Sequence, residues 1–326
     1  AGLAVVAEGQ RQRFADTPLL VVDDVLEGLR GLAGAARERM SGKVIAVTGS
    51  VGKTTTKEAL RLALSADGET HASAASYNNH WGVPLSLARC PASTKYAVLE
   101  IGMNHAGEIT PLTKLARPHI AVITAIEPVH LEYFGTLEKI AEAKAEIFAG
   151  VEPGGAAVLN RDNAQFVQLA AAARAGGIKR IVSFGEHAGT EARLLRISLQ
   201  PDSSTVKASI LRQSVTYKVG MPGRPIALNS LAVLAAASLA GADLALAALA
   251  LGNLKPPSGR GTRSTLTAPG GTALLIDESY NANPASMRAA IALLGAAPVG
   301  QHGRRIAVLG DMLELGPQGG ELHRAL

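Results

Sequence analysis

Short apolar segments alternate with helix-compatible stretches along the first half of the chain. Three of these segments are rich in β-branched residues and suit buried strands: 44–47 (VIAV), 96–101 (YAVLEI) and 120–126 (IAVITAI). Apolar strands that are separated by helices are typical of a parallel sheet covered by helices. We therefore expect an α/β fold built on a mostly parallel sheet.

The second half adds elements of a different pattern. Polar and apolar residues alternate between 191 and 219, which predicts antiparallel strands at one side of the sheet. The apolar region 226–251 breaks at Gly241 and contains polar residues, so it suits two buried alanine-rich helices rather than a membrane span. The other predicted elements are short apolar runs at 3–7 and 19–22, helices at 25–40 and from the glycine turn to about 64, and strands at 155–159, 178–184, 273–276 and 305–309.

The first of the three strands leads directly into the sequence TGSVGKT, and a helix-compatible run follows. A strand, a glycine turn and a helix N-terminus form a phosphate cradle, because backbone N–H groups and the helix dipole both favour an anion there. In such a P-loop, Lys53 reaches the β- and γ-phosphates and the Thr54 hydroxyl ligates Mg²⁺. The usual spacing has glycine where Val47 stands, so the motif is a shortened form. The alternative, a glycine turn that precedes Lys-Thr by chance, is disfavoured by the flanking strand and helix.

Two further candidates stand at the ends of the next two strands. Glu100 lies near the end of 96–101, and His130 follows 120–126. Because doubly wound sheets bind ligands at the carboxyl ends of their strands, we expect both side chains near the P-loop. A carboxylate at this edge suits Mg²⁺ that is held on phosphates. Taken alone, Glu100 could equally be a solvated loop carboxylate, and an isolated histidine is more often structural.

The segment 136–148 (TLEKIAEAKAEIF) predicts one amphipathic helix. Lys144 falls within its apolar stripe, whereas Lys139 lies on the opposite face. A lysine on a buried face needs a partner or a modification, because burial disfavours the charged ammonium group. The neutral amine is free to react, for example with CO₂ to form a carbamate. The default alternative is a lysine whose stem is buried and whose head reaches water.

Composition narrows the class of protein. The 326 residues suffice for two or three domains, and 47% hydrophobic content with 3% aromatics is that of an Ala/Leu/Val-rich α/β protein. A single cysteine, Cys90, excludes an internal disulfide and fits a reducing cytoplasm. The net charge of +5 suits an anionic ligand, but the basic residues are scattered without interleaved aromatics, so nucleic-acid binding is not supported. No secretory signal begins the chain, and we expect a cytoplasmic protein with no membrane partner.

Six segments in order resemble the Mur ligase family: TGSVGKTTTKEAL, YNNHWGVPLSL, VLEIGMNHAGEI, HLEYFGTLEKIAEAKAEIF, DESYNANPASM and VLGDMLELG. The similarity covers nearly the whole chain from about residue 15, and the DESYNANPASM and VLGDMLELG segments are most similar to the D-alanyl-D-alanine-adding branch. The resemblance implies three regions: the end of a UDP-binding domain (1–41), a central ATP-binding domain (42–300) and the start of a C-terminal domain (301–326). By comparison with the family, the chain looks truncated at both ends.

The resemblance also implies the roles of individual residues. One set, matched by position, binds ATP: Thr48, Gly49, Ser50, Val51, Gly52, Lys53, Thr54, Thr55, Asn79, Asn229, Arg260, Asp277, Tyr280 and Asn281. The catalytic set comprises Lys53, Glu100, His130 and Lys144, and the Mg²⁺ ligands are Thr54, Glu100, His130 and Lys144, of which Lys144 matches a carbamylated lysine. The chain departs from the family pattern at Thr124-Ala125, where asparagine is frequent, and at Pro225, where histidine is frequent.

The activity implied by the resemblance is an ATP-dependent ligation that joins D-Ala-D-Ala to UDP-MurNAc-tripeptide through an acyl phosphate, with release of ADP and phosphate, in a monomer. This reaction belongs to peptidoglycan precursor synthesis. Three alternatives stay open from the sequence: another Mur or folylpolyglutamate-type ligase, a P-loop ATPase module without ligase activity, and a purely structural fragment. The nature of the third peptide residue, meso-diaminopimelate or lysine, is not encoded in these motifs.

Overall fold

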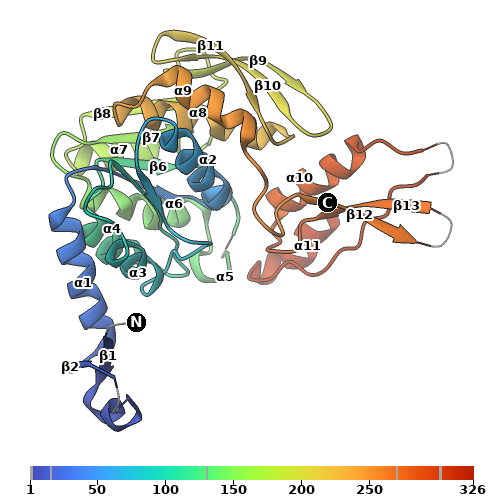
Figure 1. The fold of residues 1–326 in the computed structure, drawn as a ribbon. Helices are drawn as coiled ribbons and strands as arrows, with labels where there is room; N and C mark the ends of the chain where they lie inside the picture. The colour runs from blue at the N-terminus through green and yellow to red at the C-terminus, as the bar shows by residue number, and fades with distance from the viewer. Residues whose placement is uncertain (1–2, 15–16, 130, 269–270, 301–302) are drawn as a thin grey trace.

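A nine-stranded, mostly parallel sheet forms the centre of the protein, as expected (Figure 1). The computed structural model describes residues 3–14, 17–129, 131–268, 271–300 and 303–326. The strand order is β11-β10-β9-β8-β7-β6-β3-β5-β4, and the pairs from β4 to β9 are parallel. The parallel strands are β3 (Lys43–Thr48), β4 (Thr70–Ala72), β5 (Tyr96–Glu100), β6 (Ile120–Ile123), β7 (Ala156–Asn160), β8 (Arg180–Gly185) and β9 (Ala192–Leu199).

The antiparallel strands predicted at one side of the sheet are present. β9 pairs with β10 (Ser204–Ile210), and β10 pairs with β11 (Gln213–Val219), both in antiparallel register. Figure 1 shows these strands curling away from the parallel part at the top of the molecule. They lie at the far side of the sheet from β4, so the P-loop strand β3 stays in the parallel part, between β5 and β6.

Helices cover both faces of the sheet, because the residues of the buried strands alternate between two apolar cores. In β3, Ile45 and Val47 join one core, whereas Val44 and Ala46 join the other. The first core lies under α2 (Lys53–Ser65), α8 (Arg224–Leu239) and α9 (Leu244–Ala250). The second lies under α1 (Val25–Arg39), α3 (Gly82–Ala88), α4 (Ile109–Ala116), α6 (Leu137–Ala145) and α7 (Phe166–Ala175). The region 226–251 is thus two helices, as predicted.

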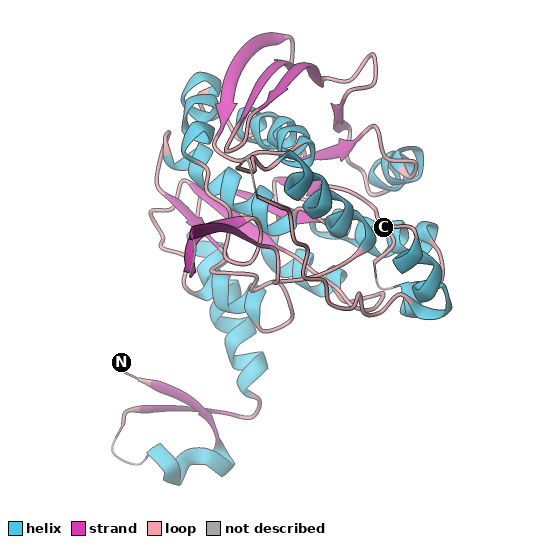
Figure 2. Cartoon of the chain, turned by 90° about the vertical axis from the view of Figure 1, so that its right-hand side faces the viewer, coloured by secondary structure: helices cyan, strands magenta, loops and turns pink. Residues whose placement is uncertain are grey.

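Both ends of the chain form smaller units outside the large sheet (Figures 1 and 2). At the N-terminus, β1 and β2 pair in parallel and protrude beyond α1. Towards the C-terminus, β12 and β13 form an antiparallel pair that precedes α10, whose Asn283 N-cap forms a capping box with Ser286. The N-terminal unit contains β1 (Ala4–Ala7), η1 (Glu8–Phe14) and β2 (Leu19–Val22). The C-terminal unit contains β12 (Thr262–Ala268), β13 (Gly271–Asp277), α10 (Pro284–Ala296), η4 (Gly316–Gln318) and α11 (Gly319–Arg324). Three short helices lie in the central part of the chain: α5 (Leu131–Phe134), η2 (Glu146–Gly150) and η3 (Leu251–Asn253).

Three details of the predicted elements are wrong. The segment 305–309 has no regular secondary structure and pairs with no strand in the described part of the chain, and Val308 is 94% exposed. Apolar β-formers become a strand only where a partner backbone satisfies their N–H and C=O groups. The strand predicted at 120–126 ends at Ile123, and the helix predicted at 136–148 changes to 3₁₀ geometry at Glu146.

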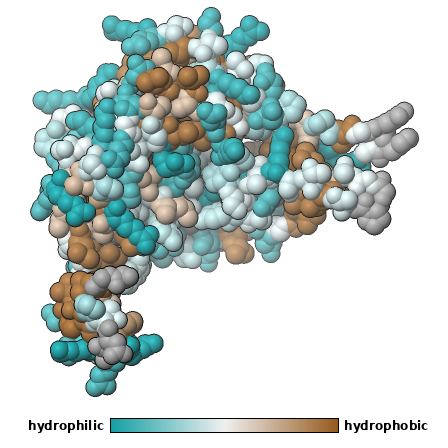
Figure 3. All heavy atoms as spheres, viewed as in Figure 1, coloured by the Kyte–Doolittle hydropathy of each residue, from teal (hydrophilic) through white to brown (hydrophobic). Residues whose placement is uncertain are grey.

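The surface is mostly polar on the body of the molecule, while apolar atoms gather near the protruding N-terminal unit (Figure 3). Exposed residues there include Leu3, Phe14, Leu20 and Leu32. Among the residues that the structure describes, no helix combines the length and apolar character that a bilayer crossing requires.

Asp67 connects three elements behind the P-loop helix. Its Oδ2 accepts hydrogen bonds from Lys95 Nζ and Tyr96 Oη, each at 2.6 Å, and its Oδ1 accepts one from the backbone N of Asp243 at 3.1 Å. These donors stabilise the carboxylate and lower the pKa of Asp67 to about 2. Asp67 thereby ties the end of α2 to the start of β5 and to the N-cap of α9.

Replacing this carboxylate should destabilise the fold in a pH-dependent way. Because its folded pKa is depressed, Asp67 contributes stability above about pH 4 and loses that contribution as the pH falls through about 2. We expect Asp67→Asn to cost about 1–3 kcal/mol at pH 7, as measured by denaturant unfolding. The difference from wild type should shrink between pH 4 and pH 2. Asp23→Asn, at an exposed aspartate, is the control; a pH-independent cost for Asp67→Asn would contradict the assignment.

Candidate active site

The P-loop has the strand-turn-helix geometry that its sequence predicts. β3 ends at Thr48 and α2 begins at Lys53, and between them Gly49 and Gly52 have φ of +148° and +80°. Both values lie in the region that favours glycine. The N-terminus of a 13-residue helix therefore faces the loop, and its free N–H groups and dipole suit phosphate oxygens.

The loop that follows β6 holds the P-loop in place. Thr124 Oγ1 donates a hydrogen bond to the carbonyl of Val51 at 2.6 Å, and Ser50 N donates to the carbonyl of Ala125 at 2.8 Å. Ser50 Oγ adds a bond to the carbonyl of Glu127 at 3.0 Å. Thr124, which departs from the family pattern, thus positions the cradle through its hydroxyl.

Two neighbours leave no room for side chains on the loop glycines. A Cβ on Gly49 would lie 2.0 Å from Thr124 Oγ1, and a Cβ on Gly52 would lie 2.5 Å from Asn229 Nδ2. Asn229 comes from the first turns of α8, about 180 residues later in the chain, and its side chain reaches the loop. The close contacts with Thr124 and Asn229 thus require glycine at both positions, as do the positive φ values of the loop.

Lys53 is the first residue of α2, and its side chain folds back onto the P-loop. Its Nζ donates to the carbonyls of Gly49 at 2.7 Å and Ser50 at 3.3 Å. Burial lowers the pKa of Lys53; the nearby Glu100 carboxylate opposes this shift, and the nearby Arg260 guanidinium adds to it. The amine is therefore folded against the loop with charged neighbours of both signs close by.

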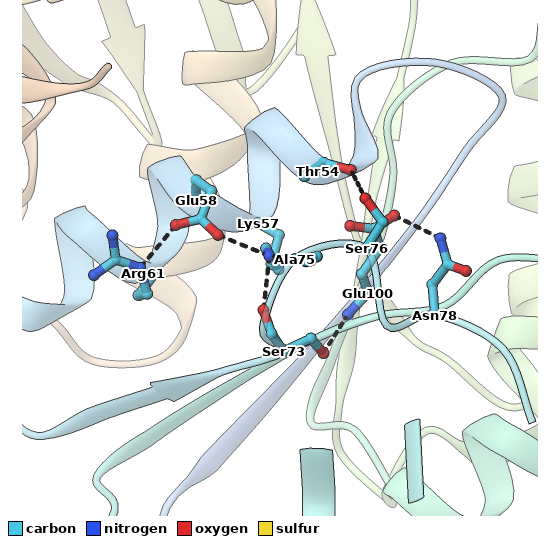
Figure 4. Close-up of polar contacts among 9 residues, drawn as sticks. All are labelled: Thr54, Lys57, Glu58, Arg61, Ser73, Ala75, Ser76, Asn78 and Glu100. Atoms are coloured by element: carbon cyan, nitrogen blue, oxygen red, sulfur yellow. Dashed lines mark hydrogen bonds and ion pairs between the residues drawn. The ribbon is translucent and has the colours of Figure 1, made fainter. Parts of the chain in front are cut away.

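Glu100 is buried at the end of β5 with one carboxylate oxygen unpaired (Figure 4). Its Oε1 accepts a hydrogen bond from Asn78 Nδ2 at 2.8 Å, while Oε2 has no partner among the described residues. The Thr54 hydroxyl lies on the same side, 3.2 Å from Ser76 Oγ. A buried carboxylate oxygen without a donor is costly unless a cation or a donor meets it. Glu100 and Thr54 therefore fit a hard cation such as Mg²⁺.

Lys144 lies inside the protein, as the helical pattern predicts. It is 1% exposed, whereas Lys139 on the same helix is exposed. Its pKa is lowered well below the usual value, first by burial and then by the positive charge of Lys53. No described residue forms a hydrogen bond or ion pair with it. Burial therefore favours the neutral form of the amine near the P-loop, and the neutral amine is the form that reacts with CO₂.

Arg260 reaches this edge from the loop before β12. Its guanidinium stacks 4.1 Å from the centre of the Tyr280 ring, and its charge influences the pKa of Lys53. Asp277 ends β13 and accepts a hydrogen bond from Ser279 N at 3.0 Å; the side chain of Ser279, and then this backbone bond, lower the pKa of the Asp277 carboxyl group. Tyr280 is half exposed beside Arg260. The arrangement offers a stacking surface next to the phosphate cradle.

The remaining candidates differ in how they are placed. Asn79 Oδ1 accepts from the backbone N of Trp81 and Gly82 and so shapes the start of α3. Asn281 is exposed and bonds to the N–H of Ala282. Thr55 is partly buried on α2, and Thr48 is buried at the end of β3. His130 lies outside the described residues.

The sequence reasoning missed Lys57, although its position gave a signal. Lys57 lies on α2 in the buried stripe that contains Leu60 and Leu64, at helical spacing. This is the same pattern that singled out Lys144. Ser73 and Ser76, which contact Glu100 and Thr54, were missed because a serine in a polar loop carries no periodic signal.

Family models describe two parts of this chain. The model of the Mur ligase middle domain matches residues 47–237, and the model of the Mur ligase, glutamate ligase domain matches residues 263–326. The chain is 33% identical over 323 residues to the UDP-N-acetylmuramoyl-tripeptide–D-alanyl-D-alanine ligase of Rickettsia prowazekii, covering 99% of this chain and 70% of that protein.

Solved structures of MurF are similar across the whole chain. A crystal structure of MurF from Acinetobacter baumannii has a TM-score of 0.86 at 34% identity and covers 98% of this chain and 67% of its own. MurF from Thermotoga maritima in complex with ADP has a TM-score of 0.81 at 26% identity, with 99% and 77% covered. The chain thus spans about two thirds to three quarters of the length of these relatives.

A methyl group on Gly49 should disrupt phosphate binding. Because its Cβ would overlap Thr124 Oγ1, Gly49→Ala must displace the loop or the clamp that holds it. We expect ADP affinity, measured by calorimetry, to fall about ten- to hundredfold, which corresponds to about 1.5–3 kcal/mol of lost charged hydrogen bonding. Gly31→Ala on α1, where a Cβ meets open space, is the matched control. Unchanged ADP binding by Gly49→Ala would show that the cradle does not hold phosphate.

Proposed function

The chain belongs to the Mur ligase family, and we propose that it joins D-Ala-D-Ala to UDP-MurNAc-tripeptide by an ATP-dependent ligation. Relatives named for this reaction match nearly the whole chain at 33–35% identity. The proposed products are the amide, ADP and phosphate. The observation that carries the proposal is the convergence of a P-loop, the half-paired Glu100 and the buried Lys144 at one edge of the sheet.

The chemistry requires activation of a carboxylate. A carboxylate is a poor electrophile, so direct attack by an amine would have to expel an oxide or hydroxide. In the proposed sequence, a carboxylate oxygen attacks the γ-phosphorus, the bond to the ADP oxygen breaks, and an acyl phosphate forms. The dipeptide amine then attacks the acyl carbon and loses a proton, and phosphate leaves. Both steps depend mainly on positioning and on neutralised charge.

The residues of the site divide these tasks. Loop N–H groups and Lys53 would bind and orient the phosphates. Thr54 and Glu100 would hold Mg²⁺, which when bound supplies Lewis acidity to the phosphate oxygens. Asn229 and Arg260 approach the loop from α8 and from the loop before β12. Arg260 would lie near the phosphates, and Asp277, Tyr280 and Asn281 would contact the nucleoside.

Lys144 is proposed to act as a carbamate. Its neutral amine attacks the carbon of CO₂ and releases a proton, which converts a buried amine into an anion. That anion would support a second cation beside Lys53 and the substrate carboxylate. The low pKa of the Lys144 amine and the absence of a described partner support this assignment. The assignment of His130 as a metal ligand stays a prediction, as do the domain limits at 41/42 and 300/301, the monomeric state and the cytoplasmic location.

The ligase and the ATPase proposals differ in what triggers phosphate release. For a ligase, release from ATP should require both UDP-MurNAc-tripeptide and D-Ala-D-Ala, and should match amide formation one to one. Coupled phosphate detection and mass spectrometry of the product measure the two quantities. Hydrolysis that proceeds equally well without either substrate would favour the switch-type ATPase instead.

Lys144 should be essential for ligation but not for nucleotide binding. We expect Lys144→Ala to lower the ligation rate more than a hundredfold while ADP binding stays near wild type, because the cradle residues are intact. A small carboxylate such as acetate should restore part of the rate if the missing group is an anion. Lys139→Ala, on the exposed face of the same helix, serves as the control. Full ligation by Lys144→Ala would rule out its catalytic role.

A further inference from the structure

A second fully buried lysine lies on the P-loop helix, one turn beyond Lys53. Lys57 is 0% exposed, and its Nζ donates to the carbonyls of Ser73 at 2.7 Å and Ala75 at 2.6 Å. It also lies 2.7 Å from Glu58 Oε1. An ammonium group has three donors, so Lys57 is saturated by these three oxygens. It therefore contributes a fixed contact rather than a reactive amine (Figure 4).

The loop that Lys57 grips is held in an unfavourable conformation. Ala75 has a φ of +46°, in the left-handed region that favours glycine. The segment follows β4 at the edge of the sheet and contains only one turn-type backbone bond of its own, from Tyr77 N to the carbonyl of Ala74. A buried cation that binds two of its carbonyls compensates for that conformation.

The same loop carries the side chains that touch both proposed Mg²⁺ ligands. Ser76 Oγ lies 3.2 Å from Thr54 Oγ1, and Asn78 Nδ2 donates to Glu100 Oε1 at 2.8 Å. Ser73 Oγ accepts from the backbone N of Glu100 at 3.3 Å. Because Asn78 occupies Oε1, the free Oε2 is the oxygen left for a cation. Figure 4 shows that these hydrogen bonds connect α2 to the loop after β4, and that loop to the end of β5.

We propose that Lys57 is a positioning residue for the metal site: by clamping residues 73–75 to α2, it fixes Ser76 and Asn78 and so orients Thr54 and Glu100. The inference rests on the proposed function in one respect, namely that the site binds a magnesium nucleotide. Groups that orient metal ligands typically change metal affinity ten- to hundredfold when they are removed. A merely structural lysine would change stability without changing that affinity.

The test is the Mg²⁺-dependent gain in ADP affinity, measured by calorimetry with excess Mg²⁺ and with EDTA. Lys57→Met keeps the length and apolar volume of the side chain but removes its three donors. We expect ADP binding in EDTA to stay near wild type, because the P-loop is intact, and the Mg²⁺-dependent gain to fall about tenfold. Hydrogen exchange at residues 73–79 should accelerate in the metal-free variant, while exchange in the P-loop should not.

Arg61→Met is the matched control. Arg61 lies one turn further along α2 and binds the same Glu58, at 2.8 Å, but it does not reach the loop. It should behave like wild type in both measurements. A folded Lys57→Met variant with the wild-type Mg²⁺ gain overturns the proposal, as does a wild type without any such gain.

A second variant keeps the test decisive if Lys57→Met does not fold. Ser76→Ala combined with Asn78→Ala leaves the clamp intact and removes its two contacts to Thr54 and Glu100. We expect the same loss of the Mg²⁺ gain, and an unchanged gain overturns the proposal. Ligation is assayed separately on the wild-type chain: a chain that binds Mg-ADP with the expected gain but forms no amide contradicts the proposed function and not this inference.

Discussion

Positive charges converge at the carboxyl edge of the sheet, and this electrostatic constraint governs the site. Burial and then the charge of Lys53 lower the pKa of Lys144, and burial together with the charge of Arg260 lowers the pKa of Lys53, so Lys144 and Arg260 both lie close to Lys53. Glu100 offsets part of this charge from the end of β5. A polyanion bound at the P-loop would relieve the repulsion between Lys53 and Arg260, and a carbamate on Lys144 would place an anion beside Lys53. Both conclusions follow from the same crowding of charge.

The sheet keeps these groups in place through contacts between neighbouring strand ends. β3 lies between β5 and β6, so the P-loop, Glu100 and the loop after β6 share one edge. Thr124 and Ser50 tie the loop after β6 to the P-loop, and Lys57 ties the loop after β4 to α2. The P-loop and α2 are thus held by hydrogen bonds from the loops after β6 and β4. Rigid support of this kind is what electrostatic catalysis requires, since donors must be in place before charge develops.

Local patterns in the sequence were sufficient to predict the parts of the site that depend on local geometry. The P-loop follows from a strand, glycines and a helix start, Glu100 from its place at a strand end, and burial of Lys144 from helical periodicity. The parallel sheet and its antiparallel side follow from apolar runs and alternation. Each of these features repeats a periodicity of the backbone, so it is visible without knowledge of the fold.

Contacts between distant segments could not be predicted in this way. The stacking of Arg260 on Tyr280, the approach of Asn229 to Gly52 and the clamp between Lys57 and Ala75 join residues whose proximity depends on the folded chain. At 305–309 a local pattern predicted a strand that is absent, because these strand-forming residues have no partner strand among the described residues. Thr124 was visible only as a departure from the family pattern, and its hydrogen bond to Val51 explains how the loop works without asparagine there.

We infer that Glu100 and Thr54 form a cation site at the mouth of the P-loop. Its most direct test is a crystal of the chain grown with ADP and Mn²⁺, in which anomalous scattering locates the metal. We expect one Mn²⁺ coordinated, at about 2.0–2.3 Å, by Glu100 Oε2 and Thr54 Oγ1 together with phosphate oxygens. ADP bound at the loop with Mn²⁺ elsewhere, and with Glu100 Oε2 still without a cation, would contradict it.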